Sequence, residues 1–215
     1  MNLFKMAQSL LDIILPRRER TMRAEILTIT DLHIAPSAES ACGIEITTLM
    51  DYRSRAVEDC VRALKYDGSA SATTLLAEAL GDYLREEIAH IQIFSTKKIL
   101  LVPMPLHTSR IRERGFNQIE LVLAKLPDEF KNGILSTLAT GVLARTRATP
   151  PQTRLSRRER LTNVLGAFVA VAEKIRGTHI FLIDDVTTTG ATLAEAAKTL
   201  EKAGSIVSAI SLARA

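Results

Sequence analysis

The sequence of this protein contains no tryptophan, and aromatic residues make up only 4% of its 215 residues. Aromatic residues are enriched in strands, so their scarcity argues against an all-β protein. The hydrophobic content is nevertheless 47%, supplied largely by alanine, leucine and isoleucine, which is ample for a core. This composition favours helices packed on a sheet of aliphatic strands.

Cysteine is nearly absent as well. Cys42 and Cys60 are too far apart for a C-x-x-C pair and too few for a disulfide framework, so we expect a reducing compartment. No stretch approaches the ~18 apolar residues of a membrane span. The apolar patch from Met6 to Leu15 is interrupted by Asp12 and is not followed by a small-residue cleavage site. We therefore expect a cytoplasmic protein with no signal peptide and no membrane span.

Apolar spacing predicts the secondary structure from about residue 52 onward. Apolar residues recur at helical spacing before Gly68 and again between about residues 72 and 89. Buried strands are predicted at Lys98–Pro103 and Ile180–Ile183, where apolar residues do not alternate with polar ones. The sequence thus predicts an α/β fold over 51–215, with a mostly parallel sheet flanked by helices. A small, irregular N-terminal segment is predicted over 1–50.

The segment after the second of these strands has the residues of a phosphate site. Asp184 and Asp185 follow the strand, and two adjacent carboxylates are costly to desolvate unless something binds them. The polar run that follows contains Thr187, Thr188, Thr189, Gly190, Ala191 and Thr192 and leads into a helix. Hydroxyls, backbone N–H groups and the helix dipole suit a phosphate there, and Gly190 lets the backbone approach a ligand closely.

Two alternatives apply to the same segment. In a Walker B segment the acid holds Mg²⁺ for a P-loop ATPase, but that requires a G-x-x-x-x-G-K-[ST] loop, and the chain contains no Gly-Lys pair. Otherwise the two aspartates form an ordinary solvated strand end and the threonines an ordinary loop.

Two further segments are rich in arginine. The first, after Pro105, is expected to be a basic loop with His107, Arg110, Arg112 and Arg114, followed by a helix that Asn117 caps. Because parallel strands end at one edge of a sheet, this loop can face the phosphate segment, where arginine forks suit a polyphosphate. The alternative is a solvated basic loop, and His107 alone is a weak signal. The second segment, Arg145–Arg154, lacks apolar periodicity and is expected to be a mobile loop with Arg147, Gln152 and Arg154.

These segments resemble known families. Ile180 to Thr192 resembles the phosphoribosyl pyrophosphate (PRPP) motif of type I phosphoribosyltransferases. Together with Ala63-Leu64-Lys65-Tyr66, the segment from Val102 to Gln118, the tract from Arg145 to Asn163 and the terminal Leu212-Ala213-Arg214, it resembles the ComF family. That group comprises competence-associated proteins that are similar to amidophosphoribosyltransferases.

The resemblance implies roles for the motif residues. Asp184 and Asp185 would contact the ribose hydroxyls, and Thr187 to Thr192 would hold the 5′-phosphate. Pyrophosphate would bind near His107, Arg110, Arg112 and Arg114, and the loop with Arg147, Gln152 and Arg154 would close over PRPP. Mg²⁺ would arrive with PRPP rather than through ligands from the protein alone.

One departure from the family concerns zinc. ComF-like proteins commonly begin with a zinc ribbon of paired C-x-x-C motifs, whereas residues 16–42 contain one cysteine. A structural zinc site needs about four soft ligands, so we predict none. The same region would correspond to the hood that selects the acceptor, and the acceptor stays unidentified.

Two functions of different classes follow. The first is a Mg²⁺-dependent phosphoribosyltransferase, a glycosyltransferase that releases pyrophosphate and in which Arg112 and Arg114 act with Asp184 and Asp185. The second is a non-catalytic accessory in competence and DNA uptake that binds PRPP and single-stranded DNA and contacts other competence proteins. For DNA, Phe116 is the only candidate for stacking on bases, so the arginines predict mainly sequence-independent phosphate contacts.

Overall fold

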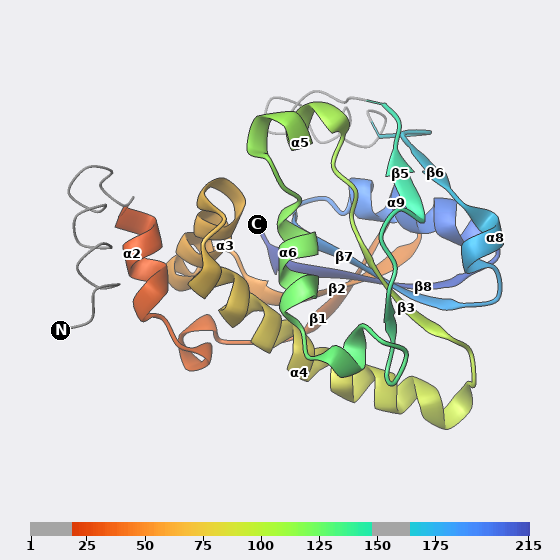
Figure 1. The fold of residues 1–215 in the computed structure, drawn as a ribbon, viewed down its shortest axis with the longest axis horizontal. Helices are drawn as coiled ribbons and strands as arrows, with labels where there is room; N and C mark the ends of the chain where they lie inside the picture. The colour runs from red at the N-terminus through yellow and green to blue at the C-terminus, as the bar shows by residue number, and fades with distance from the viewer. Residues whose placement is uncertain (1–18, 148–163) are drawn as a thin grey trace.

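The computed structural model describes residues 19–147 and 164–215 (Figure 1). Within these ranges the elements in chain order are α2 (Glu19–Ile26), η1 (Ile29–Leu32), β1 (Ser37–Ala41), β2 (Ile44–Asp51), α3 (Arg55–Asp67), α4 (Ala70–Phe94), β3 (Ile99–Pro103), α5 (Thr108–Arg114), α6 (Gln118–Lys125), η2 (Asp128–Phe130), β4 (Thr137–Leu138), β5 (Leu143–Arg145), β6 (Phe168–Ala170), α8 (Ala172–Ile175), β7 (His179–Thr187), α9 (Ala191–Lys202) and β8 (Ile206–Arg214).

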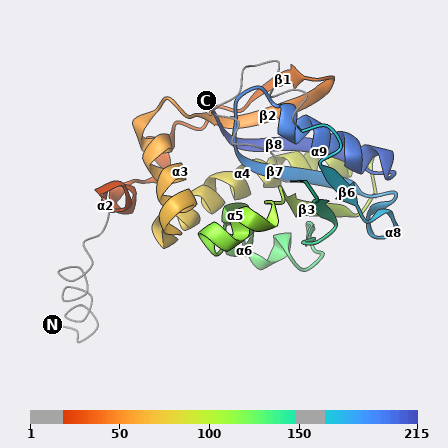
Figure 2. The same ribbon diagram turned by 90° about the horizontal axis from the view of Figure 1, so that it is seen from above.

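The main sheet has the strand order β1-β2-β8-β7-β3-β4 in the described part of the chain. Every neighbouring pair is parallel except β1 and β2, which are antiparallel. Seen from above, β1, β2, β8, β7 and β3 follow one another across the molecule (Figure 2). β7 is therefore an interior strand, and the carboxyl end of β3, Pro103, lies opposite Ile183, four residues before the end of β7. The predicted α/β fold with a mostly parallel sheet flanked by helices is confirmed.

Helices cover both faces of this sheet. Phe181 and Ile183 of β7 pack into a core shared with α3, α4 and α6, whereas Ile180 and Leu182 pack into a second core with α9 and the β5–β6 pair. The apolar residues of β7 do not alternate with polar ones because each face is buried. This is the arrangement that the uninterrupted apolar run predicts.

The two predicted helices before β3 are confirmed, but α4 is longer than expected. α3 ends at Gly68, whose φ of 59° is left-handed. α4 continues beyond residue 89 to Phe94, because no helix-breaking residue occurs before Ser95. His90 therefore lies within the helix and not at its end. Among the described residues, no helix has both the length and the apolar content needed to cross a membrane.

The N-terminal part is joined to the rest through the sheet. β2 pairs in parallel with β8, and Met50 and Asp51 of β2 are opposite Ala213 and Arg214. The division expected at residue 50 therefore falls inside a strand of the main sheet. β1 and β2 are also more regular than the sequence indicates, since they form an antiparallel pair in which Ser37–Ala41 lies opposite Ile44–Thr48.

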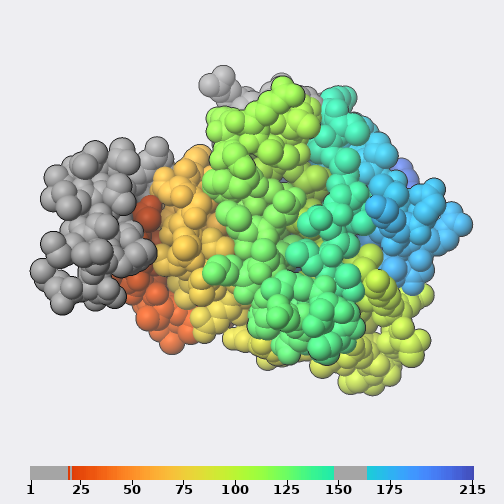
Figure 3. Space-filling view, in the orientation of Figure 1, coloured from red at the N-terminus to blue at the C-terminus, as the bar shows by residue number. Residues whose placement is uncertain are grey.

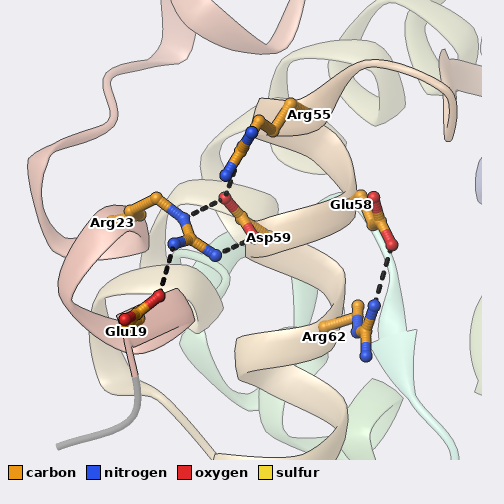
Figure 4. A network of polar contacts seen from close by, with 6 residues as sticks. All are labelled: Glu19, Arg23, Arg55, Glu58, Asp59 and Arg62. Atoms are coloured by element: carbon orange, nitrogen blue, oxygen red, sulfur yellow. Dashed lines mark hydrogen bonds and ion pairs between the residues drawn. The ribbon is translucent and has the colours of Figure 1, made fainter.

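An ion-pair network fixes α2 against α3 (Figure 4). Arg23 donates from Nε to Asp59 Oδ2 at 2.6 Å and from Nη2 to Asp59 Oδ1 at 2.9 Å. Arg55 lies 3.9 Å from the same carboxylate, and Glu19 accepts a hydrogen bond from Arg23. A two-pronged contact from a planar guanidinium to a nearly buried carboxylate orients the two helices relative to one another.

The basic stretch after Pro105 is a helix, not the loop that we expected. His107 caps α5, because its Nδ1 accepts a hydrogen bond from the Ser109 N–H at 3.2 Å. Gly115 ends the helix with a φ of 83°. Asn117 then caps α6 as predicted, accepting from the Ile119 N–H through Oδ1 at 3.0 Å. The expectation was wrong because three closely spaced arginines indicate a solvated loop, whereas the residues on either side of them, His107 and Gly115, cap a helix.

Candidate functional site at the carboxyl end of β7

The two aspartates lie near the carboxyl end of β7, Asp184 three and Asp185 two residues before its last residue, Thr187. Asp185 is buried, and Asp184 is half-buried. The Asp184 Oδ1 accepts a hydrogen bond from the Asp185 N–H at 2.9 Å, and the Asp185 Oδ1 accepts one from the Val186 N–H at 2.6 Å. Backbone groups of the strand therefore help to orient both carboxylates.

Asp185 has two further partners from other elements. Lys65 Nζ, at the end of α3, lies 3.1 Å from Asp185 Oδ2. Gln118 Nε2, in the first turn of α6, donates to the same oxygen at 2.7 Å. Asp185, a residue that is 5% exposed and held in this way, is not part of an ordinary solvated strand end.

The two carboxyl groups differ in their affinity for protons. Burial raises the pKa of Asp184 to about 7, and the charge of Asp185 adds to this rise. Burial acts in the same direction on Asp185, but the charge and hydrogen bond of Lys65, together with the hydrogen bonds from the Val186 N–H and Gln118, outweigh it. The pKa of Asp185 is therefore below its ordinary value. At neutral pH the pair is thus one fixed carboxylate beside one group that is close to its titration point.

The threonine segment is only partly open to a ligand. Thr187 is still in β7, opposite Arg214 of β8, and its side chain is buried, as is that of Ala191. Thr188 is exposed, whereas Thr189 and Thr192 are half-buried. Thr189 Oγ1 accepts a hydrogen bond from the Ala191 N–H at 3.4 Å, which places this hydroxyl at the start of α9. Among these threonines, Thr188, Thr189 and Thr192 are the ones that keep solvent-exposed surface.

Gly190 has a structural role that the sequence did not indicate. It precedes α9 with a φ of 73°, and a Cβ at this position would lie 2.5 Å from Ala41 Cβ and 2.6 Å from Ile46 Cδ1. The absent side chain therefore makes room for the β1–β2 pair. Packing alone is a sufficient reason for this glycine.

The basic helix α5 is linked to the aspartates. Arg114 Nη1 donates to Gln118 Oε1 at 3.3 Å, and Gln118 in turn donates to Asp185. Arg110 and Arg114 are half-buried, whereas Arg112 is exposed. In the space-filling view, α5 and α6 (green) lie between α3 (orange) and the β5–β6 segment (teal to blue) (Figure 3). The structure thus brings the first arginine segment and the motif strand together.

Tyr66 adds an aromatic ring to this group. The guanidinium of Arg114 lies 5.7 Å from the centroid of the Tyr66 ring, within range of a cation–π contact. The ring is 53% exposed. Phe116 is therefore not the only aromatic residue near the basic helix.

The second arginine segment is described only at its start. Arg145 ends β5, and its guanidinium lies 5.5 Å from the centroid of the Phe168 ring. Burial lowers the pKa of Arg145, the charge of Arg110 lowers it further, and the charge of Asp184 raises it. Arg147 is exposed and donates to the Leu165 carbonyl at 2.9 Å. Gln152 and Arg154 lie outside the described residues.

Three residues of this arrangement were not among the predicted site residues: Lys65, Gln118 and Arg145. Lys65 ends an amphipathic helix before a glycine, a position at which a lysine is usual for helix capping alone. Gln118 follows a helix cap and has no distinctive spacing. The available signal was indirect, since Lys65 and Gln118 lie in segments that resemble the ComF family. Among the described residues, no group of three His, Cys, Asp or Glu side chains is arranged to hold a metal ion.

Solved structures that are similar to this chain include two phosphoribosyltransferases. A hypoxanthine phosphoribosyltransferase from Staphylococcus aureus is 14% identical, covers 66% of this chain and 62% of its own, and gives a TM-score of 0.37. An orotate phosphoribosyltransferase from Mycobacterium tuberculosis H37Rv is 13% identical, covers 90% and 82%, and gives a TM-score of 0.35. Because both TM-scores are below 0.5, the family assignment rests on sequence relatives and not on these two structures.

No family model matches the chain, but curated relatives do. The DNA utilization protein YhgH of Escherichia coli (strain K12) is 31% identical over 161 residues, which are 74% of this chain and 66% of that protein. The competence protein ComFC of Streptococcus pneumoniae is 30% identical over 162 residues, 75% of this chain and 64% of that protein. The competence protein F of Haemophilus influenzae is 32% identical over 106 residues, 48% of this chain and 44% of that protein. The chain spans about two thirds of the length of the first two relatives, and it belongs to the ComF family.

Proposed function

We propose that this protein binds PRPP with Mg²⁺ at the carboxyl end of β7 and transfers its phosphoribosyl group to an acceptor with release of pyrophosphate. The observation that supports this most directly is the contact chain from Asp185 through Gln118 to Arg114. It places an acidic strand end, suited to sugar hydroxyls, beside a basic helix, suited to a polyphosphate. The threonines that precede α9 adjoin the same strand end.

Each group has a role in this proposal. Asp184 and Asp185 form the acidic side of the site, which takes the ribose hydroxyls. The segment from Thr187 to Thr192 surrounds the 5′-phosphate, with hydroxyls from Thr188, Thr189 and Thr192. The pyrophosphate lies toward α5, where Arg112 and Arg114 stabilise the charge that develops on the leaving group, together with His107 and Arg110. Arg147, Gln152 and Arg154 belong to the segment proposed to cover the bound ligand and exclude water.

The donor set fits Mg²⁺ as a companion of PRPP rather than as a resident ion. The acidic pair offers two carboxylates, one of them committed to Lys65, which is too few for a site built from protein alone. When bound with PRPP, Mg²⁺ would supply positive charge that favours departure of pyrophosphate. The chain itself would hold the ribose and the departing pyrophosphate in fixed positions on the two sides of the breaking C1–O bond. An acceptor nitrogen would approach C1 from the opposite face.

The second candidate is a non-catalytic accessory of competence that binds PRPP and single-stranded DNA. The names of the relatives, a DNA utilization protein and two competence proteins, favour it. Arg112 and Tyr66 are both exposed near Arg114, which combines a phosphate contact with a surface for stacking. A location in the cytoplasm and contact with other competence proteins belong to this proposal.

Pyrophosphate release distinguishes the two functions. We would incubate the protein with PRPP, Mg²⁺ and a panel of nucleobases and amines and measure pyrophosphate. Release that depends on one acceptor supports the enzyme. Measurable PRPP binding with no release, together with binding of single-stranded DNA that weakens steeply with salt, supports the accessory. If DNA does not bind at low ionic strength, the accessory function is excluded.

A further inference from the structure

The two aspartates of β7 are not equivalent. Both oxygens of Asp185 are engaged: Oδ2 by Lys65 and Gln118, and Oδ1 by the Val186 N–H. For Asp184, the Asp185 N–H is the only hydrogen-bond donor among the described residues. Because Asp184 is also the more exposed of the two, it can turn a carboxylate oxygen toward a ligand.

Lys65 forms an ion pair with Asp185, and bringing these two charges out of water has a considerable desolvation cost. The side chain of Lys65 is 24% exposed and that of Asp185 is 7% exposed. Burial lowers the pKa of Lys65, but the charge and hydrogen bond of Asp185, together with the charge of Asp184, outweigh burial and raise it, so Lys65 carries its charge. A desolvated ion pair contributes little net stability compared with apolar residues of similar size. Its presence at the end of β7 is better explained by the position that it imposes on Asp185.

Gln118 connects this pair to the basic helix. Its Oε1 accepts from Arg114, which has no acceptor, and its Nε2 donates to Asp185. The reverse orientation of the amide would place its donors against the guanidinium and its oxygen against the carboxylate. The two neighbours therefore fix one amide orientation, and the position of Arg114 depends on that of Asp185.

We propose that Lys65 and Gln118 are positioning residues that hold the Asp185 carboxylate in place and leave Asp184 as the carboxylate that contacts the ligand. This inference rests on the proposed function, since the ligand is PRPP. It assigns direct contact to one member of the acidic pair and an indirect role to the other. Gln118 links Asp185 to Arg114, so the acidic group proposed for the ribose and the basic group proposed for the pyrophosphate keep a fixed relative position.

The test is a double-mutant cycle on Lys65 and Asp185, read by calorimetric binding of Mg²⁺-PRPP. Lys65→Met leaves a buried carboxylate without its cation, and Asp185→Asn leaves a buried lysine without its anion. Each single variant should weaken PRPP binding by roughly ten- to hundredfold, the usual cost of removing a supporting contact. Lys65→Met with Asp185→Asn removes both charges together, so the double variant should bind more tightly than either single variant.

Matched variants complete the design. Arg62→Met, on the same helix, removes a cation that pairs with Glu58 on the surface and should leave PRPP affinity unchanged. Lys65→Arg retains the charge and should restore part of the affinity that Lys65→Met loses. Asp184→Asn should weaken binding severely, and adding Lys65→Met should weaken it further. If one of the single variants fails to fold, PRPP affinity can still be compared among three others: the Lys65→Met, Asp185→Asn double variant, Lys65→Arg and Asp184→Asn.

Recovery of binding in the double variant supports the positioning role. A double variant that binds as weakly as, or more weakly than, the single variants means that Lys65 or Asp185 contacts the ligand directly, and it overturns the inference while PRPP binding by the wild type stands. If the wild-type protein does not bind PRPP, the proposed function fails, and this inference fails with it.

Discussion

Gly190 and Ile46 are so close that a Cβ on Gly190 would lie 2.6 Å from Ile46 Cδ1. Ile46 is a buried residue of β2, in the part of the chain for which the sequence predicts only an irregular segment. The segment between β7 and α9, which contains Gly190, is therefore built directly against the β1–β2 pair. The position of the threonines depends on packing between two regions that are far apart in the sequence.

Gly190→Ala should destabilise the protein strongly. An alanine would strain the backbone at a φ of 73° and would overlap Ala41 and Ile46. Left-handed backbone typically costs about 1–2 kcal/mol and overpacking about 1–3 kcal/mol, so we expect a loss of about 2–5 kcal/mol in the free energy of unfolding. Urea unfolding measures it.

Gly177→Ala is the matched control for that substitution. Gly177 has a φ of 77°, but a Cβ there would meet no atom within 4 Å. Only the backbone strain applies, and we expect a loss of about 1–2 kcal/mol. Equal effects of the two substitutions would show that contact with β1 and β2 is not what requires glycine at position 190.

The affinity for PRPP should depend on pH through Asp184. Burial raises the pKa of this group to about 7, and accepting sugar hydroxyls requires the carboxylate. Affinity should therefore rise between pH 6 and pH 8, by at most about tenfold per pH unit below the pKa. Because the phosphates of PRPP also titrate in this range, the comparison is with Asp184→Asn, in which the part of the slope due to Asp184 should disappear.

The same pKa has an opposite consequence for stability. A carboxyl whose pKa is higher in the folded than in the unfolded state binds its proton more tightly on folding, so its contribution to stability decreases as pH rises from about 4 to about 7. In wild type without ligand, this decrease should be visible relative to Asp184→Asn. Parallel stability curves for the two proteins across this range would contradict the raised pKa.

The two cysteines should differ in reactivity. Cys42 is exposed in the turn between β1 and β2, whereas Cys60 is completely buried in α3 and burial raises its pKa to about 12. Thiolate is the reactive form, so iodoacetamide at pH 8 should modify Cys42 alone in the native protein and both residues in denaturant. Mass spectrometry of digested protein shows which is labelled. Similar rates at both cysteines in native protein would contradict the packing of α3.

Arg23→Met should loosen α2. It removes the two hydrogen bonds from Arg23 to Asp59 and leaves the more distant Arg55, at 3.9 Å, beside that carboxylate. Backbone amides of Glu19–Ile26 should then exchange faster with deuterium, while those of β7 and β8 keep their protection. Arg62→Met serves as control, because its partner Glu58 is well exposed to solvent and the substitution should not change exchange in α2.

Much of the fold could be predicted because the signals are local. Ile180 to Ile183 is buried on both faces and forms the interior strand, Gly68 stops α3, and Asn117 caps α6, as expected. Predictions failed where a decision depended on distant parts of the chain. Nothing near β2 indicates that it pairs with β8, a strand more than 150 residues later.

In the candidate site as well, residues with a local signal could be predicted from the sequence, and residues brought in by distant packing could not. Asp184 and Asp185 stand out in the sequence because carboxylates rarely follow a buried strand without a purpose. Lys65 and Gln118 do not, since a lysine at a helix end and a glutamine in a first turn are ordinary surface residues in most helices. Only the packing of α3 and α6 against β7 brings them to Asp185.

The central claim is that the acidic end of β7 is a PRPP site, and calorimetry tests it most directly. Wild-type protein and the Asp184→Asn, Asp185→Asn double variant would be titrated with PRPP in the presence of Mg²⁺, after circular dichroism has shown that both are folded. We predict saturable binding to the wild type and a loss of at least about a hundredfold in the variant, which corresponds to about 2.7 kcal/mol. Equal affinity in the folded double variant, or no binding to the wild type, would contradict the account.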